Sequence, residues 1–445
     1  MDRKAILPAG GSRTGEWRGS VVDMACKPLV INQSWLYGKH PDVTGMQESL
    51  SELLSMYPVL AGRIHDGGIA CNGAGVFFEC QTCSDVSIGD ISRRKFPGKR
   101  FMAACDARSM QAGKSPVLNI RLSLLRDGAL LNVKCSHFCA DGSSFYRMME
   151  EWAMLTRGER PGEVSCHDDG VLPGILAGSD AYRVLKAADT AGAEEIVRRE
   201  GACRIGPSAM FPMLWQKITG LDRRLSVPVF IPDAEIRAVQ DRVAEACGRR
   251  VGRNAVLSAM TVALLGKPMG WTGRKISMVH TADHRKRVSG LGRDYMGNAS
   301  FTLPPSVISA GLPVEEIAVL AENDTRRMLS PDAEERYFGI YCAMIERKLP
   351  YLTFDINTMW CSRPTTFIIN NCLKFNIYGI DFGSGAPLFA WPLDFGDPVR
   401  FWPAPPGKEG VYVYFTGRFA GAFLHAPSDS LDIGYDTVVG GKVLR

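Results

Sequence analysis

Within residues 117–156 the hydrophobic pattern changes from alternation to helical spacing. Apolar residues stand at positions 118, 120, 122 and 124, and alternation resumes at 131, 133 and 135 after the turn sequence RDG at 126–128. This pattern predicts a β-hairpin. Beyond Gly142 apolar residues fall at 145, 148, 149, 152 and 155, which predicts a helix with Ser143 or Ser144 as its N-cap. His137 is therefore expected where a strand ends and a helix begins, a place from which a side chain can reach a cleft.

The segment before this hairpin also carries strand and helix patterns. Apolar residues at 46, 50, 53, 54 and 57 predict an amphipathic helix that ends at Pro58. Residues 68–79 alternate in the manner of strands. We expect residues 20–23 and 28–35 to form a first short strand and its approach.

Residues 157–225 hold few long periodic segments, and we interpret them as a crossover between domains 1–156 and 226–445, with a helix around 181–188. Beyond the crossover, Asp233 is a plausible cap for a helix that carries Ile236. Further helices are expected at 255–265 and 314–328, and strands at 276–280, 366–369, 411–416 and 419–424. Because helices and strands mix with hairpins, a purely parallel doubly wound sheet is disfavoured.

Length and composition narrow the class of protein. The chain has 445 residues, too many for one ordinary core, and its 46% hydrophobic and 22% charged residues are typical of globular proteins. The net charge of +5 comes without a basic stripe, so we expect no nucleic-acid partner. No apolar run has the length of a signal peptide or a membrane span, which favours a cytoplasmic protein.

Thirteen cysteines are scattered along the chain without a disulfide framework. The motif Cys80-Gln-Thr-Cys83 has no matching second pair, so we expect no metal site and interpret the cysteines as free thiols in a reducing compartment. Cys135 and Cys139 flank His137 in an extended chain. A cysteine nucleophile activated by His137 is one interpretation, and two packed thiols are the other.

The imidazole of His137 can act as a general base near neutral pH, or it can be an ordinary packed histidine held by one hydrogen bond. Its context, CSHFCADG at 135–142, contains the pattern His-x-x-x-Asp-Gly. This pattern resembles the active-site motif of the BAHD acyl-CoA-dependent acyltransferases. Three more segments resemble blocks of that family in the same order: LSELLSMYPVLAGR at 50–63, DHRKR at 283–287 followed by YMGNA at 295–299, and DFGSGAP at 381–387, in which Ser384 replaces a tryptophan.

The resemblance implies an α/β fold of two similar domains, each a mixed sheet with flanking helices as in chloramphenicol acetyltransferase, with His137 in a channel at their interface. It implies direct acyl transfer from acyl-CoA to a hydroxyl or amine of a small-molecule acceptor, with His137 as general base. It also implies that Asp141 pairs with Arg285 and that Ser384 lies near coenzyme A. We expect acyl-CoA as a co-substrate, no tightly bound cofactor, and a monomer.

The roles of Asp381 and Ser384 are each open between two interpretations. Asp381 is either a second acid-base carboxylate or a structural carboxylate that caps a turn or pairs with an arginine away from the channel. The Gly-rich segment that follows it also fits a tight turn. The donors to the oxyanion are open between backbone N–H groups and hydroxyls such as that of Ser384.

Other functions compete with the acyl-CoA-dependent enzyme. A condensation domain of peptide synthesis resembles this fold, but its histidine usually follows another histidine, and this chain has Ser136. A non-catalytic scaffold is a hypothesis of another class, and the intact His137 disfavours it.

Overall fold

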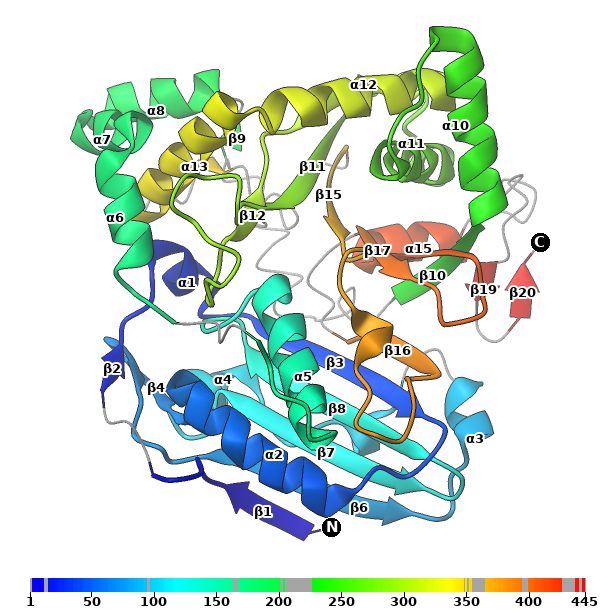
Figure 1. Cartoon of the computed structure of the whole chain (residues 1–445). Coiled ribbons are helices and arrows are strands. Elements are labelled where there is room, and N and C mark those ends of the chain that lie inside the picture. The colour runs from blue at the N-terminus through cyan, green and yellow to red at the C-terminus, as the bar shows by residue number, and fades with distance from the viewer. Residues whose placement is uncertain are drawn as a thin grey trace. The chain divides into compact units, whose positions relative to one another are not determined.

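The computed structural model describes residues 2–11, 15–93, 97–162, 167–200, 203–204, 226–347, 349, 352–353, 365–393, 399–425, 437–439 and 442–444. The chain divides into two compact units, shown in Figure 1. Unit 1 comprises Met1–Ile175, Gly290–Ser300 and Phe375–Asp394, and unit 2 comprises the remainder. The units therefore interleave in sequence and do not follow the contiguous division at 157–225, because two short segments of the second half pack with the first.

Unit 1 contains a mixed sheet in the order β1-β6-β7-β8-β3-β16. Only β6 and β7 are parallel among these pairs; the other neighbours are antiparallel. The strands are β1 (Asp2–Ile6), β3 (Val30–Tyr37), β6 (Val76–Cys83), β7 (Leu118–Leu125), β8 (Ala129–Ser136) and β16 (Phe389–Pro392). The predicted hairpin is confirmed as β7 and β8, and most of its side chains are buried on both faces.

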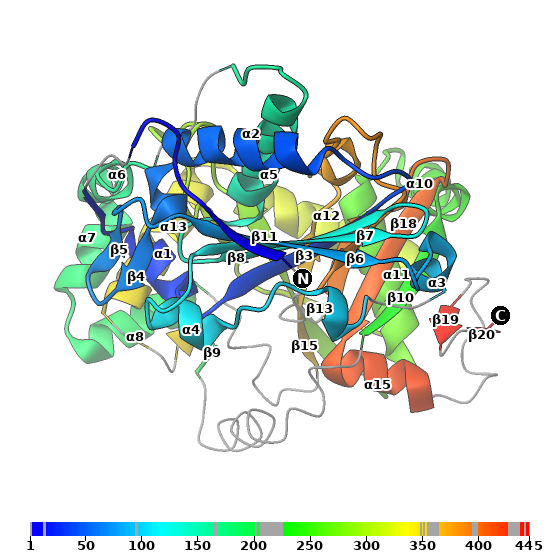
Figure 2. The same cartoon turned by 90° about the horizontal axis from the view of Figure 1, so that it is seen from below.

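Two helices lie side by side on one face of this sheet, α2 (Val43–Met56) and α5 (Gly142–Thr156), as Figures 1 and 2 show. Both carry their buried residues at helical spacing, as predicted. The indole N–H of Trp152 on α5 donates to the carbonyl oxygen of Met46 on α2 at 3.1 Å. The N-cap of α5 is Asp141, not Ser143 or Ser144, because its carboxylate accepts the N–H of Ser144.

The remaining elements up to residue 187 are short. They are β2 (Glu16–Trp17), α1 (Val21–Cys26), η1 (Pro58–Ala61), β4 (Arg63–His65), β5 (Gly68–Ala70), α3 (Ile88–Ser92), η2 (Lys99–Phe101), α4 (Ala107–Gln111), α6 (Val171–Gly178) and α7 (Asp180–Ala187), with η4 (Ile377–Gly379) before β16. The prediction of a strand at 20–23 was wrong. Ser20 accepts the N–H of Asp23 and Asp23 accepts that of Ser20, which is a capping box that starts a helix.

Unit 2 is built on a second mixed sheet in the order β12-β11-β15-β17-β18-β10-β19-β20, with β13 beside β11. Its strands are β10 (Ser226–Pro232), β11 (Lys275–Asp283), β12 (Ser300–Thr302), β13 (Ser306–Ser309), β15 (Thr366–Asn371), β17 (Val399–Pro403), β18 (Gly410–Thr416), β19 (Thr437–Val439) and β20 (Lys442–Leu444). A separate pair joins β9 (Cys203–Arg204) and β14 (Leu352–Thr353). Parallel pairs β11–β15–β17 adjoin antiparallel pairs, so the predicted mixed sheet is confirmed.

Several helices of unit 2 pack with this sheet around a large apolar core, namely α10 (Asp233–Cys247), α11 (Arg253–Gly266), α12 (Val314–Met328) and α15 (Gly417–His425). Unit 2 also contains α8 (Thr190–Arg199) and α13 (Pro331–Glu346), and α13 contacts α7 and α12. The predicted helices at 255–265 and 314–328 are confirmed by α11 and α12, and the helix around 181–188 by α7. Asp233 begins α10 but is not its cap, which is Pro232.

The strand predicted at 419–424 is instead the helix α15. Gly417 has a φ of 56°, a left-handed conformation that ends β18 and turns the chain. Phe419 and Ala420, adjacent in sequence, are both buried, which fits a helix face better than a strand that alternates sides. Residues 205–225 of the predicted crossover lie outside the described residues.

Candidate active site

His137 lies in the turn between β8 and α5 and is partly exposed, whereas residues 135, 136 and 138–141 are buried. Its backbone N–H donates to the carbonyl oxygen of Leu29 at 2.9 Å, which continues the contact of β8 with β3 past the end of the strand. Buried neighbouring residues thus hold the tight turn, while the imidazole of His137 stays partly exposed. This is the placement that the change of period predicted.

The ring of His137 is held by Asn298. Nδ1 of the imidazole lies 2.8 Å from Oδ1 of the amide, and Nδ2 of the same amide donates to the carbonyl oxygen of His137 at 2.8 Å. Asn298 is fully buried. An amide oxygen can only accept, so Nδ1 carries the proton and Nε2 is left with a free electron pair. A neutral histidine in this tautomer can accept a proton at Nε2.

Asn298 is fixed in turn by Asp23. Oδ1 of Asp23 accepts the backbone N–H of Asn298 at 2.6 Å and its side-chain Nδ2–H at 2.8 Å, while Oδ2 accepts the N–H of Ser20 at 2.7 Å. Asp23 is fully buried, and burial raises the pKa of its carboxyl to about 6 in spite of these donors. All these residues belong to unit 1.

Asp141 ties the turn to the segment that carries Asn298. Its carboxylate accepts the N–H of Ser144 at 3.0 Å, the N–H of Ala299 at 3.0 Å and the hydroxyl of Ser300 at 2.9 Å, and it is buried. The N–H of Asp141 donates to the carbonyl oxygen of Gly297 at 3.2 Å. Asp141 therefore positions the His137 turn against residues 297–300 rather than presenting a carboxylate to substrate.

The predicted pair of Asp141 with Arg285 joins residues of different units and stays a prediction. Within unit 2, Arg285 is buried and its Nη1 lies 3.0 Å from Oδ1 of Asp283.

Asp381 and Ser384 lie at the C-terminal end of α5, whereas His137 and Asp141 lie at its N-terminal end. Arg157, the C-cap residue of α5, donates to the carbonyl oxygen of Asp381, and the ring of Phe382 lies 4.6 Å from that of Trp152. A helix of 15 residues is about 20 Å long, which separates this turn from His137. The structure therefore brings together His137 and Asp141, and leaves Asp381 and Ser384 apart from them.

The carboxylate of Asp381 closes a turn. Its Oδ1 accepts the N–H groups of Gly383 at 2.8 Å and Gly385 at 2.9 Å. Both glycines have positive φ, 85° and 101°, which only glycine adopts readily. This geometry supports the structural interpretation of Asp381. The buried hydroxyl oxygen of Ser384 has no hydrogen-bond partner among the described residues.

The thiols beside His137 contact each other and backbone oxygens. Sγ of Cys135 lies 3.8 Å from Sγ of Cys139, and the Cys139 thiol donates to the carbonyl oxygen of Ser136 at 3.2 Å. Both side chains are fully buried. The contact with Cys135, together with burial, raises the pKa of the Cys139 thiol well above its usual value. A thiol that stays protonated is a poor nucleophile, which favours the packing interpretation.

Two further histidines have a different environment. Nε2 of His167 lies 2.8 Å from the carbonyl oxygen of Cys139, and burial lowers its pKa to about 4. Burial likewise lowers the pKa of His280, in unit 2, to about 4. These two side chains are neutral packing residues at neutral pH.

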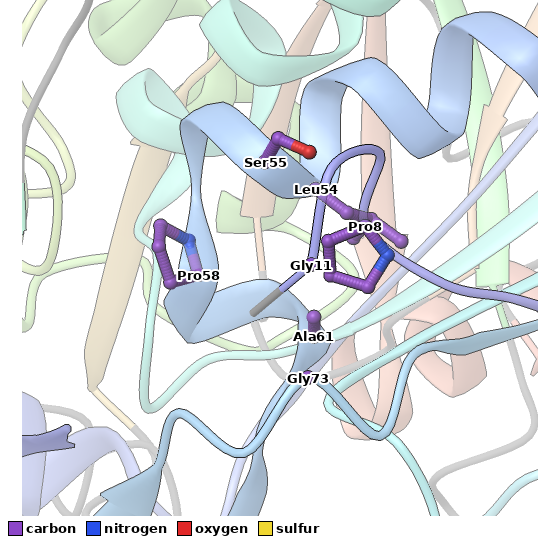
Figure 3. A pocket seen from close by; sticks show the side chains of 7 residues that line it. All are labelled: Pro8, Gly11, Leu54, Ser55, Pro58, Ala61 and Gly73. Atoms are coloured by element: carbon purple, nitrogen blue, oxygen red, sulfur yellow. The ribbon is translucent and has the colours of Figure 1, made fainter. Parts of the chain in front are cut away.

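A pocket in unit 1 carries none of these groups (Figure 3). It is lined by Pro8, Gly11, Leu54, Ser55, Pro58, Ala61 and Gly73. Across the part of the chain that the structure describes, no three His, Cys, Asp or Glu side chains gather so that they could bind a metal ion. Nor does any helix in those ranges combine the length and the apolar character that crossing a membrane requires.

Sequence reasoning missed Asn298 and Asp23 as parts of this site. Asn298 lies in the segment YMGNA that carried the family resemblance, yet no role was attached to it. Asp23 had a local signal, the Ser-x-x-Asp pattern of a capping box, which predicts a helix start but not a contact with a residue 275 positions away.

Known proteins resemble this chain in sequence. A model of the transferase family matches residues 1–179. The BAHD acyltransferase BIA1 of Arabidopsis thaliana is 23% identical over 471 residues, which cover 96% of this chain and 97% of that protein. The predicted resemblance to the BAHD acyltransferases is confirmed, and the class of activity that these relatives support is acyl transfer.

Solved structures share the fold at low sequence identity. TRI101 of F. graminearum, in a complex with ethyl coenzyme A, superposes with a TM-score of 0.66 at 13% identity and covers 96% of this chain and 100% of that one. The first condensation domain of the calcium-dependent antibiotic synthetase, bound to a substrate analogue, has a TM-score of 0.57 at 14% identity, over 92% and 91% of the two chains. The predicted two-part α/β fold is confirmed.

Proposed function

We propose that the protein transfers an acyl group from acyl-CoA to a hydroxyl or amine of a small molecule, with His137 as general base. The observation that carries this proposal is the contact of Asn298 Oδ1 with His137 Nδ1, which leaves Nε2 unprotonated on a partly exposed ring. The acyl donor is supported by the coenzyme A derivative bound to the structural neighbour TRI101.

The chemistry follows from one free imidazole nitrogen. Nε2 of His137 takes the proton of the acceptor hydroxyl or amine, and the acceptor oxygen or nitrogen attacks the thioester carbonyl carbon. The tetrahedral intermediate collapses as its C–S bond breaks. The proton on His137 passes to the departing thiolate, so an ester or amide and free coenzyme A leave. Both substrates must be bound at once, and no acyl-enzyme forms.

The residues around His137 position it rather than react. Asp141 holds the turn through residues 299 and 300, and the buried thiols of Cys135 and Cys139 contact each other and the carbonyl oxygen of Ser136. Asp381 and Ser384 take no part in proton transfer in this mechanism, because they lie at the other end of α5. Ser384 remains our proposed contact with coenzyme A.

The test is turnover of a panel of acyl-CoAs with candidate hydroxyl and amine acceptors, followed by mass detection of products. We expect a product with wild-type protein and a loss on the order of 10²-fold or more with His137→Ala at an unchanged melting temperature. A folded His137→Ala variant that turns over within a few-fold of wild type would contradict the general-base mechanism.

Condensation chemistry and a non-catalytic scaffold role remain the competing functions. The similar fold of a condensation domain is the reason to test condensation chemistry. An assay that offers the same acyl group either on free coenzyme A or on a phosphopantetheinyl carrier protein distinguishes these functions. Transfer from the carrier but not from free acyl-CoA supports condensation chemistry. A folded protein without thioester turnover from either donor supports the scaffold.

A further inference from the structure

We propose that Asp23 is a positioning residue: through the Asn298 amide it holds His137 in the tautomer that leaves Nε2 free. The inference rests on the proposed function for its catalytic consequence, but the hydrogen-bond chain itself exists in the protein without substrates. Asp23 does not touch the imidazole, and it acts only through Asn298.

The orientation of the Asn298 amide is decided by its neighbours. Its Nδ2 lies 2.8 Å from Oδ1 of Asp23 and 2.8 Å from the carbonyl oxygen of His137, and both of these atoms are acceptors. A flipped amide would set its oxygen against a carboxylate and a carbonyl, with no proton between them. The NH₂ group therefore faces Asp23, and the amide oxygen faces Nδ1 of His137.

The tautomer of His137 follows from this orientation. Nδ1 faces an acceptor at 2.8 Å and must carry the proton. With a flipped amide, Nδ1 would accept a hydrogen bond and the proton would reside on Nε2, the atom that the mechanism needs free. The carboxylate of Asp23 thus favours the reactive tautomer of His137 through two successive hydrogen bonds, one from Asn298 to Asp23 and one from His137 to Asn298.

The carboxylate at position 23 does more than cap a helix. The chain has a second capping box of the same pattern, Ser87–Asp90 at the start of α3. There the other carboxylate oxygen pairs with Arg93 at the surface, at 2.7 Å. In the Ser20–Asp23 box that oxygen is buried and accepts two N–H groups of Asn298. Capping alone does not require a fully buried carboxylate, because the Asp90 box caps without one.

The backbone is shaped to allow this approach. Gly297 has a φ of 113°, and a Cβ at that position would lie 3.1 Å from Oδ1 of Asp23. A side chain there would press on the carboxylate oxygen that Asn298 uses. The carbonyl oxygen of Gly297 also accepts the Ser144 hydroxyl at 2.9 Å, which ties this loop to α5.

The experiment compares Asp23→Asn with Asp90→Asn, which weakens a capping box of the same pattern away from the site. We expect Asp23→Asn to lower kcat by about 10-fold to 100-fold with little change in the KM for acyl-CoA, by analogy with the loss of outer hydrogen-bond partners of metal-ligating histidines. Asp90→Asn should keep the wild-type kcat. If both variants lose kcat equally, the effect is general destabilisation and the proposal is wrong.

A double-mutant cycle asks whether Asp23 acts through Asn298. In an Asn298→Ala background, Asp23→Asn should cause no further loss of kcat, because the link is already removed. A full additional loss in that background would show that Asp23 acts by another route, and would overturn the proposal.

The tautomer is read directly from ¹⁵N chemical shifts of labelled histidine, with His137→Ala used to assign the signal among the seven histidines. Wild-type His137 should carry its proton on Nδ1, and Asp23→Asn should shift population to the Nε2–H form. A wild-type Nε2–H tautomer overturns the proposal even if Asp23→Asn fails to fold. This measurement needs no turnover, so it still tests the link if the protein transfers no acyl group.

Discussion

The two ends of helix α5 each carry a turn with a motif aspartate, and the two turns differ in burial. At the first end Asp141 is buried and accepts hydrogen bonds from Ser144, Ala299 and Ser300. At the last end Asp381 is only half-buried, and its carboxylate accepts two N–H groups of its own Gly-rich turn. One carboxylate joins distant parts of unit 1, whereas the other closes a local loop.

This contrast shows what a motif can and cannot specify. Both aspartates belong to segments that resemble family signatures, and both bind backbone N–H groups. His137, whose Nε2 is free to accept a proton, lies at the first end, where Asn298 holds its ring. The motif thus predicts where a turn occurs, but burial and long-range partners decide what its carboxylate does.

Among substitutions of the two motif aspartates, Asp141→Ala should lower the free energy of unfolding the most. The substitution removes an N-cap, which is typically worth about 1 kcal/mol, and leaves the buried N–H of Ala299 without this acceptor, at about 1–3 kcal/mol. We expect the free energy of unfolding to fall by about 2–4 kcal/mol, and turnover to fall with it because the His137 turn loosens. Urea unfolding followed by circular dichroism measures the first, and acyl transfer measures the second.

Asp141→Asn sharpens this result, because it keeps the size of the side chain while replacing one acceptor oxygen by a donor. An intermediate loss would fit the hydrogen-bonding role. A fully active and equally stable Asp141→Ala protein would show that the buried carboxylate does not hold the turn, and would erase the difference between the two ends of α5.

Asp381→Ala should have a smaller effect. The two hydrogen bonds to Gly383 and Gly385 lie in an exposed turn, so we expect a loss of stability below about 1 kcal/mol and turnover within a few-fold of wild type. The same unfolding and transfer assays check this. A loss of turnover as large as that of His137→Ala, in a folded protein, would instead restore Asp381 as an acid-base residue and reverse the comparison.

Much of this architecture could be predicted from local patterns, and the parts that could not depend on contacts between distant residues. Alternation and helical spacing located β7, β8, α2 and α5, and the ordered motifs indicated the family. The partner of His137 could not be found in this way, because Asn298 is 161 residues away and no periodicity connects them. The helix at 417–425 was missed because a short apolar run fits either a strand or a helix.

The smallest effect is expected at the first end of α5, from Cys139→Ser and Cys135→Ser. Both thiols are buried, and the pKa of Cys139 is raised, chiefly by its contact with Cys135 and also by burial, so neither should act as a nucleophile. Each variant should keep most of its activity, acyl-CoA alone should leave no mass adduct, and initial-rate kinetics should show a ternary complex rather than a ping-pong pattern. A stoichiometric adduct that is lost in Cys139→Ser would instead place the acyl group on the enzyme. The fold and the family resemblance would stand, but the His137 end of α5 would then hold a cysteine nucleophile beside its base, and direct transfer would be wrong.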